Sequence, residues 1–308
     1  MTRVLLVGNH NIGHDALRIL IEAGVNVIGV FAHPDSTDPH DQWYRSVKTL
    51  GTRAGIPIWQ PKTLKADDTI QTVKALAPDL LLSVSYGKIL PRPILETPRY
   101  GSVNLHGALL PDYRGRFCPI WAVMNGERRS GASLHMMEEG IDTGDIIDQA
   151  AFEITDSDTG YSVYMRMCAH ALDLLRRNLP ALLAGDFARR PQPYVGSYFS
   201  SLTDDDRCVR WDRPGRTLLN QIRACYFPPY PCSHTYWQGD RYPVWRAALA
   251  DVHGTHRPGT VVGFDDADRP TVAVADGAIT LLETELVRPY LGVGSVLALG
   301  RPALREAS

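Results

Sequence analysis

The beginning of the chain alternates between strand and helix patterns, and this alternation limits the folds it can adopt. Residues 4–7 are a short apolar run that ends at Gly8, as in a strand buried on both faces. Residues 14–23 then carry apolar side chains at the spacing of one helix face, and residues 25–31 form a second apolar run. Strands joined by a helix are parallel, so the sequence predicts an α/β fold: a Rossmann-like, mostly parallel sheet with helices on both faces.

The pattern changes beyond the longest helical stretch, which spans residues 159–183. A Pro-containing segment at 191–204 predicts a linker. Residues 205–308 contain one helical pattern and then short β-like runs at regular spacing, as in a small barrel or sandwich. We therefore expect an α/β domain over residues 1–190 and a β-rich domain over residues 205–308.

Charge and hydropathy exclude several classes of protein. The formal net charge is −2 and there is no clear basic run, so nucleic acid is not favoured as a partner. No apolar run is long enough to cross a membrane, and the apolar run at residues 4–7 is too short for a secretion signal. We expect a cytoplasmic protein that has no membrane partner.

The cysteines give no sign of a disulfide framework or a metal site. They are scattered along the chain and no Cys-x-x-Cys pair occurs. The sequence therefore predicts reduced thiols and no bound metal. The five residues are Cys118, Cys168, Cys208, Cys225 and Cys232.

Polar side chains of three kinds follow a strand pattern in the middle of the chain. Asn104 and His106 are two residues apart on an extended segment, so their side chains point to the same side. Asp142 lies between Gly140 and Gly144, which allow a sharp turn that could carry the carboxylate to the histidine.

Each of these residues also has a simpler interpretation when it is taken alone. Asn104 could bond to neighbouring backbone, His106 could be a structural histidine, and Asp142 could be a turn residue. Together they define one reaction class, because an amide can donate to an oxyanion while a carboxylate sets the protonation of an imidazole. The three residues therefore predict an acyl-transfer site.

The segment from Asn104 to Gly115 resembles the signature of the 10-formyltetrahydrofolate-dependent formyltransferases. Residues 131–137, leading into 142–144, resemble the second motif of that family, and the resemblance covers most of residues 1–190. Residues 211–231 resemble the start of the small OB-like C-terminal domain found in several members. The resemblance implies that residues 1–190 are the catalytic domain, that Asn104, His106 and Asp142 are catalytic, and that N10-formyltetrahydrofolate is the formyl donor.

The resemblance also implies where the two substrates bind. Two segments would wrap the pterin of the donor, largely through their backbone: Tyr86, Gly87, Lys88, Ile89 and Leu90, and then Met137, Glu138, Glu139, Gly140 and Ile141. The acceptor would contact Leu110, Pro111, Tyr113, Arg114, Arg116, Trp121 and Tyr230. In this interpretation the guanidiniums bind a pyrophosphate and an aromatic ring stacks on a base or a sugar.

The acceptor is inferred from one loop. Methionyl-tRNA formyltransferases carry a basic loop after the second strand, whereas residues 33–42 contain no Lys or Arg. The sequence thus favours the sugar-nucleotide branch of the family, with a UDP- or dTDP-linked amino sugar (a 4-amino sugar) as acceptor and no nucleic acid. Formylation of methionyl-tRNA or of a small natural-product amine is the first alternative. A non-catalytic folate- or nucleotide-binding protein is the second, and a homodimer is left open.

Overall fold

A computed structural model describes residues 1–38, 43–252, 254–288 and 291–300, and the chain divides into two compact units. The first unit comprises Met1–Cys118, Ser130–Phe152 and Met165–Phe199, and the second comprises Pro119–Arg129, Glu153–Tyr164 and the chain from Ser200 onward. Segments of the two units thus alternate along the chain. The linear boundaries at residues 190 and 204 stay predictions.

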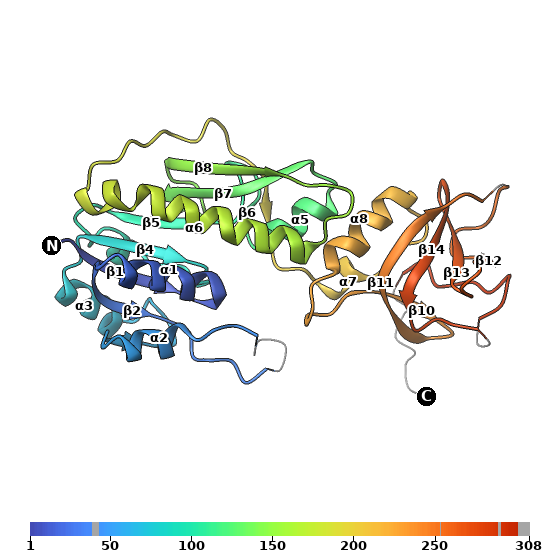
Figure 1. Cartoon of the computed structure of the whole chain (residues 1–308), viewed down its shortest axis with the longest axis horizontal. Helices are drawn as coiled ribbons and strands as arrows, with labels where there is room; N and C mark the ends of the chain where they lie inside the picture. Colours follow the sequence, from blue (N-terminus) through green and yellow to red (C-terminus); the bar gives the residue numbers. More distant parts are fainter. Residues whose placement is uncertain (39–42, 253, 289–290, 301–308) are drawn as a thin grey trace. The chain divides into compact units, whose positions relative to one another are not determined.

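The first unit is built on a seven-stranded sheet in the order β3-β2-β1-β4-β5-β7-β8 (Figure 1). Its pairs from β3 to β5 are parallel, and β7 is antiparallel to β5. This arrangement confirms the mostly parallel sheet. The strands are β1 (Arg3–Gly8), β2 (Asn26–Phe31), β3 (Ile58–Trp59), β4 (Leu80–Val84), β5 (Ser102–His106), β7 (Arg129–Met136) and β8 (Ile146–Glu153).

Helices flank this sheet, and their apolar faces pack against it as the sequence pattern predicts. In α1, for example, Ile12, Ala16, Leu17 and Leu20 are all buried. The helices of this unit are α1 (His10–Glu22), α2 (Val47–Arg53), α3 (Asp67–Leu76), α4 (Arg92–Leu95) and α6 (Gly160–Ala184) from Met165 onward. Helix α5 (Cys118–Met124) after its first residue, and the start of α6, belong to the second unit.

The start of α2 differs from the sequence pattern, which suggests a helix from residue 43. Ser46 caps the helix, because its hydroxyl accepts a hydrogen bond from the Thr49 amide at 3.0 Å. Upstream of this cap, Tyr44 stacks on the His10 ring at 4.1 Å between centroids. The aromatic residue is therefore used in a loop contact and not on a helix face.

The β-rich C-terminal region forms a five-stranded antiparallel sheet in the order β10-β11-β14-β13-β12. Its core contains Trp211, which is fully buried and donates its indole N–H to Thr235 at 2.9 Å. These strands confirm the predicted small OB-like domain. Its elements are α7 (Asp204–Arg207), α8 (Gly215–Cys225), β10 (Ser233–Trp237), β11 (Asp240–Ala250), β12 (Val261–Phe264), β13 (Pro270–Val274) and β14 (Gly277–Thr284).

Two very short strands, β6 (Arg114–Gly115) and β9 (Tyr198–Phe199), pair in parallel and were not predicted. Two-residue strands are too short to show a period in sequence. The pair fastens the segment expected to be a linker onto the loop that follows Asn104 and His106, so part of residues 191–204 supports the site.

All five cysteines are buried thiols outside any disulfide. Among the residues that the structure describes, no helix is long and apolar enough to cross a membrane. The same residues contain no group of three or more His, Cys, Asp or Glu side chains arranged to hold a metal ion. The cytoplasmic location and the homodimer stay predictions.

Candidate active site

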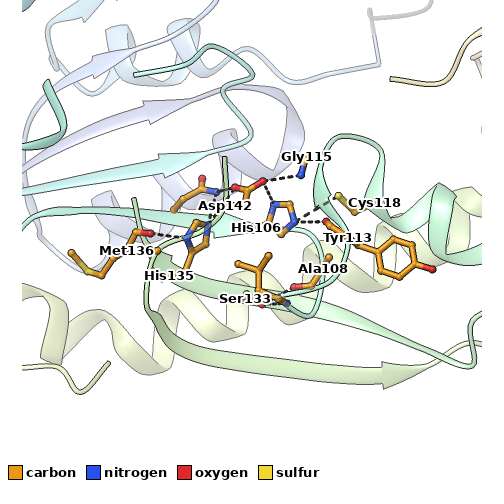
Figure 2. Close-up of polar contacts among 12 residues, drawn as sticks. His106, Ala108, Tyr113, Gly115, Cys118, Ser133, His135, Met136 and Asp142 are labelled. Carbon is orange, nitrogen blue, oxygen red and sulfur yellow. Dashed lines mark hydrogen bonds and ion pairs between the residues drawn. The ribbon is translucent and has the colours of Figure 1, made fainter. Parts of the chain in front are cut away.

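The antiparallel pair β5 and β7 presents four polar side chains on one face of the sheet. Asn104 lies directly opposite His135, and His106 lies directly opposite Ser133. Residues two apart on a strand share a face, and so do residues directly opposite on neighbouring strands. The sheet therefore fixes the spacing of these four side chains before any loop is added, and Figure 2 labels three of them, His106, Ser133 and His135.

Asp142 reaches this face from the loop after β7, as expected. Its Oδ2 lies 3.5 Å from His106 Nδ1, and its Oδ1 lies 3.4 Å from the Asn104 amide nitrogen. The left-handed conformation belongs to Asp142 itself, with φ of 54°, and Gly144 leaves room for the nearby Met136 carbonyl. The structure thus brings Asn104, His106 and Asp142 together, while their catalytic roles stay predictions.

Backbone and side-chain contacts hold the Asp142 carboxylate in place. The Gly115 amide in β6 donates to Asp142 Oδ2 at 2.9 Å. The Gln192 side chain donates to the carbonyl oxygens of Asp142 and Gly144 at 2.8 and 2.9 Å. The first contact fixes the carboxylate and the other two fix the loop backbone that carries it, so the carboxylate is preorganised for the histidine beside it.

His106 is held as a cation beside this carboxylate. Burial by itself lowers the pKa of His106, but the Asp142 charge outweighs burial and raises the pKa to about 9. Its Nε2 lies 2.8 Å from the Tyr113 carbonyl oxygen, which can only accept, so Nε2 carries a proton. With Nδ1 facing Asp142, both ring nitrogens act as donors at neutral pH.

Asp142 shows the complementary shift. Burial by itself raises the pKa of this carboxyl, but the positive charge on His106 and the Gly115 amide lower it well below its usual range. The residue is therefore a carboxylate throughout the physiological pH range. Together, the two shifts describe a buried ion pair next to the Asn104 amide.

Sequence reasoning missed two residues of the site, His135 and Ser133. Ser133 is fully buried, donates to the Ala108 carbonyl at 2.6 Å and accepts from the Leu110 amide at 3.0 Å, so it fixes the loop after His106. His135 contacts Asn104. The signal was present, because the spacing of Ser133 and His135 repeats that of Asn104 and His106, but the register that pairs them is visible only in the fold.

The two segments predicted to hold the pterin lie near each other. Met137 packs against the core cluster that includes Tyr86 and Leu90. The exposed apolar side chains of Ile89 and Ile141, one on each segment, suit contact with a flat apolar ring. The other predicted members, Gly87, Glu138, Glu139 and Gly140, are exposed.

Two side chains of these segments point elsewhere. The Tyr86 ring stacks on His33, and the Lys88 ammonium donates to the carbonyl oxygens of Pro61 and Lys62 at 2.9 and 3.1 Å. Any contact of Tyr86 or Lys88 with the donor would therefore use the backbone, in line with the prediction, which itself stays untested.

The residues predicted to bind the acceptor divide into internal and exposed groups. Leu110 and Pro111 are buried, and the Tyr113 ring stacks on Phe199. Arg114 donates from one guanidinium nitrogen to the Gly196 carbonyl at 2.8 Å, so part of its guanidinium holds the chain's own backbone. The exposed Arg116 donates to the Gly87 carbonyl at 2.6 Å. This hydrogen bond joins a residue predicted to bind the acceptor to a residue predicted to bind the folate donor.

Trp121 and Tyr230 lie in the second unit. Trp121 donates to the Ser200 carbonyl at 2.9 Å and lines a cavity of about 840 Å³ with Arg210 and Arg213. Tyr230 packs edge-on against Phe227. Their role in acceptor binding stays a prediction.

Comparison with known proteins decides the family. Residues 4–179 match the formyl transferase model, and residues 201–288 match the model of the formyl transferase C-terminal domain. The chain belongs to the formyl transferase family. It is an N-formyltransferase whose formyl donor is N10-formyltetrahydrofolate. The non-catalytic alternative is therefore wrong.

Relatives of known function match nearly the whole chain. A methionyl-tRNA formyltransferase of Pelotomaculum thermopropionicum is 36% identical over 92% of this chain and 90% of its own length. One from Bacillus subtilis is 31% identical over 93% of this chain and 90% of its own length. The similarity thus spans the catalytic and the C-terminal domains.

Solved structures share the fold at lower identity. The sugar 3N-formyltransferase WlaRD superposes with a TM-score of 0.68 at 22% identity and covers 91% of this chain and 97% of its own. An N-formyltransferase of Helicobacter canadensis, solved with folinic acid and dTDP-3-aminofucose, gives 0.67 at 21% identity, over 91% of this chain and 99% of its own. These likenesses describe the fold and not the acceptor.

These comparisons correct the predicted acceptor. The sugar-nucleotide acceptor and the exclusion of nucleic acid are wrong, because the relatives that are 29–36% identical are methionyl-tRNA formyltransferases. The inference rested on residues 33–42, of which 39–42 lie outside the described residues. One loop without Lys or Arg is a small part of a surface, and phosphates can be bound by cations elsewhere.

Proposed function

We propose that this enzyme transfers the formyl group of N10-formyltetrahydrofolate to the amino group of methionyl-tRNA. The observation that carries the proposal is the match to methionyl-tRNA formyltransferases over both domains, with 92% of this chain aligned to 90% of one relative. Similarity that includes the C-terminal domain supports a shared acceptor, because a donor site alone would need only the catalytic domain.

The site supplies the groups that this transfer requires. As the amine attacks the formyl carbon, negative charge develops on the formyl oxygen. The Asn104 amide can donate a hydrogen bond to this oxygen, and a donor of this kind lowers the barrier by about 3 kcal/mol. The N–H groups of His106 face Tyr113 and Asp142, so the His106 cation stabilises the same oxygen through its positive charge. The position of Asn104 and His106 on a buried strand means that they need little reorganisation during the reaction.

The proton balance follows from the two shifted pKa values. A new C–N bond forms to the acceptor, the bond to N10 of the folate breaks, and one proton moves from the amine to N10. His106 is already protonated below its pKa of about 9, so it acts as a donor and cannot take the first proton. The Asp142 carboxylate holds His106 and orients a water that takes the amine proton and passes a proton to N10, so Asp142 itself stays ionised.

The test compares two acceptors that share the α-amino group of methionine, one esterified to tRNA and one free. The protein is incubated with N10-formyltetrahydrofolate and either methionyl-tRNA or free methionine, and N-formylmethionine is measured by mass spectrometry after the ester is hydrolysed. We expect product from methionyl-tRNA only, and a loss of at least about 100-fold in Asn104→Ala. Equal formylation of free methionine would contradict the proposal and favour a small amine acceptor.

A further inference from the structure

We propose that His135 is a positioning residue for the reaction. Its unprotonated Nε2 accepts a hydrogen bond from Asn104 and fixes which end of the Asn104 amide faces the reacting oxygen. The proposal rests on the proposed role of Asn104 in formyl transfer, and it does not depend on the identity of the acceptor.

The hydrogen bonds of His135 determine which ring nitrogen carries the proton. Nδ1 lies 2.7 Å from the Met136 carbonyl oxygen, which can only accept, so Nδ1 is protonated. Nε2 lies 3.1 Å from the Asn104 amide nitrogen, which can only donate. To accept this hydrogen bond, Nε2 must be unprotonated. Asp142 Oδ1, at 3.5 Å, is the more distant neighbour of the same nitrogen.

The same contacts fix the orientation of the Asn104 amide. Its nitrogen faces two acceptors, His135 Nε2 at 3.1 Å and Asp142 Oδ1 at 3.4 Å. If the amide were rotated by half a turn, its oxygen would face a lone pair and a carboxylate, and no hydrogen bond would remain. His135 and Asp142 thus select one of the two orientations.

The two bonds of Asn104 have different strengths. The hydrogen aimed at His135 makes the shorter bond, whereas the hydrogen aimed at Asp142 spans a distance beyond the usual range for a strong bond. The second hydrogen can therefore change partner when a negatively charged oxygen forms beside it. In this arrangement His135 anchors one N–H while the other stays available for the substrate.

The surroundings make His135 a rigid anchor. It is buried at 1% exposure on β7, directly opposite Asn104 on β5. Figure 2 shows the His135 ring beside the Met136 carbonyl and Asp142. A side chain placed by strand register needs no loop movement to act.

Two variants separate the role of His135 as a hydrogen-bond acceptor from its role in packing. His135→Gln can place an amide oxygen where Nε2 lies, so it keeps an acceptor for Asn104. His135→Asn can reach only the position of Nδ1, so it keeps the Met136 bond and loses that acceptor. We expect kcat to fall about tenfold in His135→Asn, with KM for the donor unchanged, and most of the loss to be recovered in His135→Gln. His170→Asn, a histidine on α6 whose Nδ1 bonds the Arg166 carbonyl, is the matched control.

A double-mutant cycle tests whether His135 acts through Asn104. In an Asn104→Ala background, His135→Asn should cause no further loss of kcat. If the fold-loss of kcat in the double variant were the product of the losses in the two single variants, the positioning role would be overturned. Equal kcat in His135→Gln and His135→Asn would also overturn it. If Asn104→Ala alone retains full turnover, the proposed function of the site fails instead, so the two failures are distinct.

A spectroscopic measurement tests the proposal without any amine substrate. In ¹⁵N NMR of the protein, His135 Nε2 should show the shift of an unprotonated nitrogen, and Nδ1 that of a protonated one. The Asn104 side-chain amide signal, assigned by its loss in Asn104→Ala, should move in His135→Asn and much less in His135→Gln. A protonated Nε2 in the wild-type protein would overturn the proposal.

Discussion

At the scale of single residues, the site depends on a balance between burial and charge. Burial disfavours both the His106 cation and the Asp142 carboxylate, yet each is held in its charged form by the other. Removing one partner leaves the other buried and unpaired. The pair therefore makes the protonation of the site sensitive to a single substitution.

The first prediction at this scale concerns Asp142→Asn. The substitution removes the charge that raises the pKa of His106 and leaves burial, which lowers it, so His106 should change from a pKa of about 9 to below 6.5. Titration of the His106 ring followed by NMR measures both values. The same pKa in the variant and the wild type would show that the carboxylate is not the cause.

The pair also predicts how stability depends on pH. The folded-state pKa of His106 lies above its ordinary 6.5, so its contribution is complete below that pH and is lost as the pH rises through about 9. The pKa of Asp142 lies below its ordinary 3.8, so its contribution is complete above that pH and is lost in stronger acid.

Urea unfolding at a series of pH values tests this window. The advantage of the wild type over the Asp142→Asn variant in free energy of unfolding should be largest between pH 3.8 and 6.5 and should shrink toward pH 9. A difference that stays constant across this range would show that the two groups do not titrate as a pair.

At the scale of elements, the two-residue strand β6 connects the fold to the chemistry. Gly115 has φ of 98°, and a Cβ there would collide with the Phe199 carbonyl oxygen in β9. Its amide is also the donor that holds Asp142 at 2.9 Å. A glycine is therefore needed both for the backbone and for the approach of the two strands.

We predict that Gly115→Ala lowers the free energy of unfolding by more than about 1 kcal/mol and also lowers kcat. The second effect follows because the displaced amide no longer fixes the carboxylate. Gly24→Ala is the matched control, since Gly24 has φ of 65° and open space around it. Gly24→Ala should cost some stability and leave kcat unchanged; equal effects on kcat would contradict the role of β6.

At the scale of the whole molecule, charge bears on the acceptor. The chain has 32 Lys and Arg against 34 Asp and Glu, so if the acceptor is methionyl-tRNA, as proposed, the attraction must come from local groups of cations and not from net charge. In the second unit, Arg210 and Arg213 are exposed and line the cavity that also includes Trp121. In the proposed function, such groups would contact a limited number of phosphates.

A salt titration follows from this picture. KM for methionyl-tRNA should rise with salt, with a slope of roughly 0.7–0.9 in logarithmic units for each phosphate contact, while KM for the folate donor changes little. Steady-state kinetics from low to moderate ionic strength measure both values. A KM for methionyl-tRNA that does not respond to salt would contradict phosphate contacts with the acceptor.

The sequence by itself determined the α/β class and the convergence of Asn104, His106 and Asp142. Local periodicity sufficed for the α/β class and for the shared face of Asn104 and His106, because strand side chains alternate by two and apolar runs mark buried strands. The approach of Asp142 was expected from the glycines around it and from the resemblance to the formyltransferases. The sequence did not determine the acceptor, since one loop without basic residues says little about a whole surface.

Only the tertiary structure revealed what holds the site in place. His135 became a partner of Asn104 through the register between β5 and β7, and Gly115 became a donor to Asp142 through the pairing of β6 with β9. Arg114, which looked like a ligand for phosphate, binds the Gly196 backbone. Such contacts join residues far apart in the chain, so they depend on how strands pair and not on any local pattern.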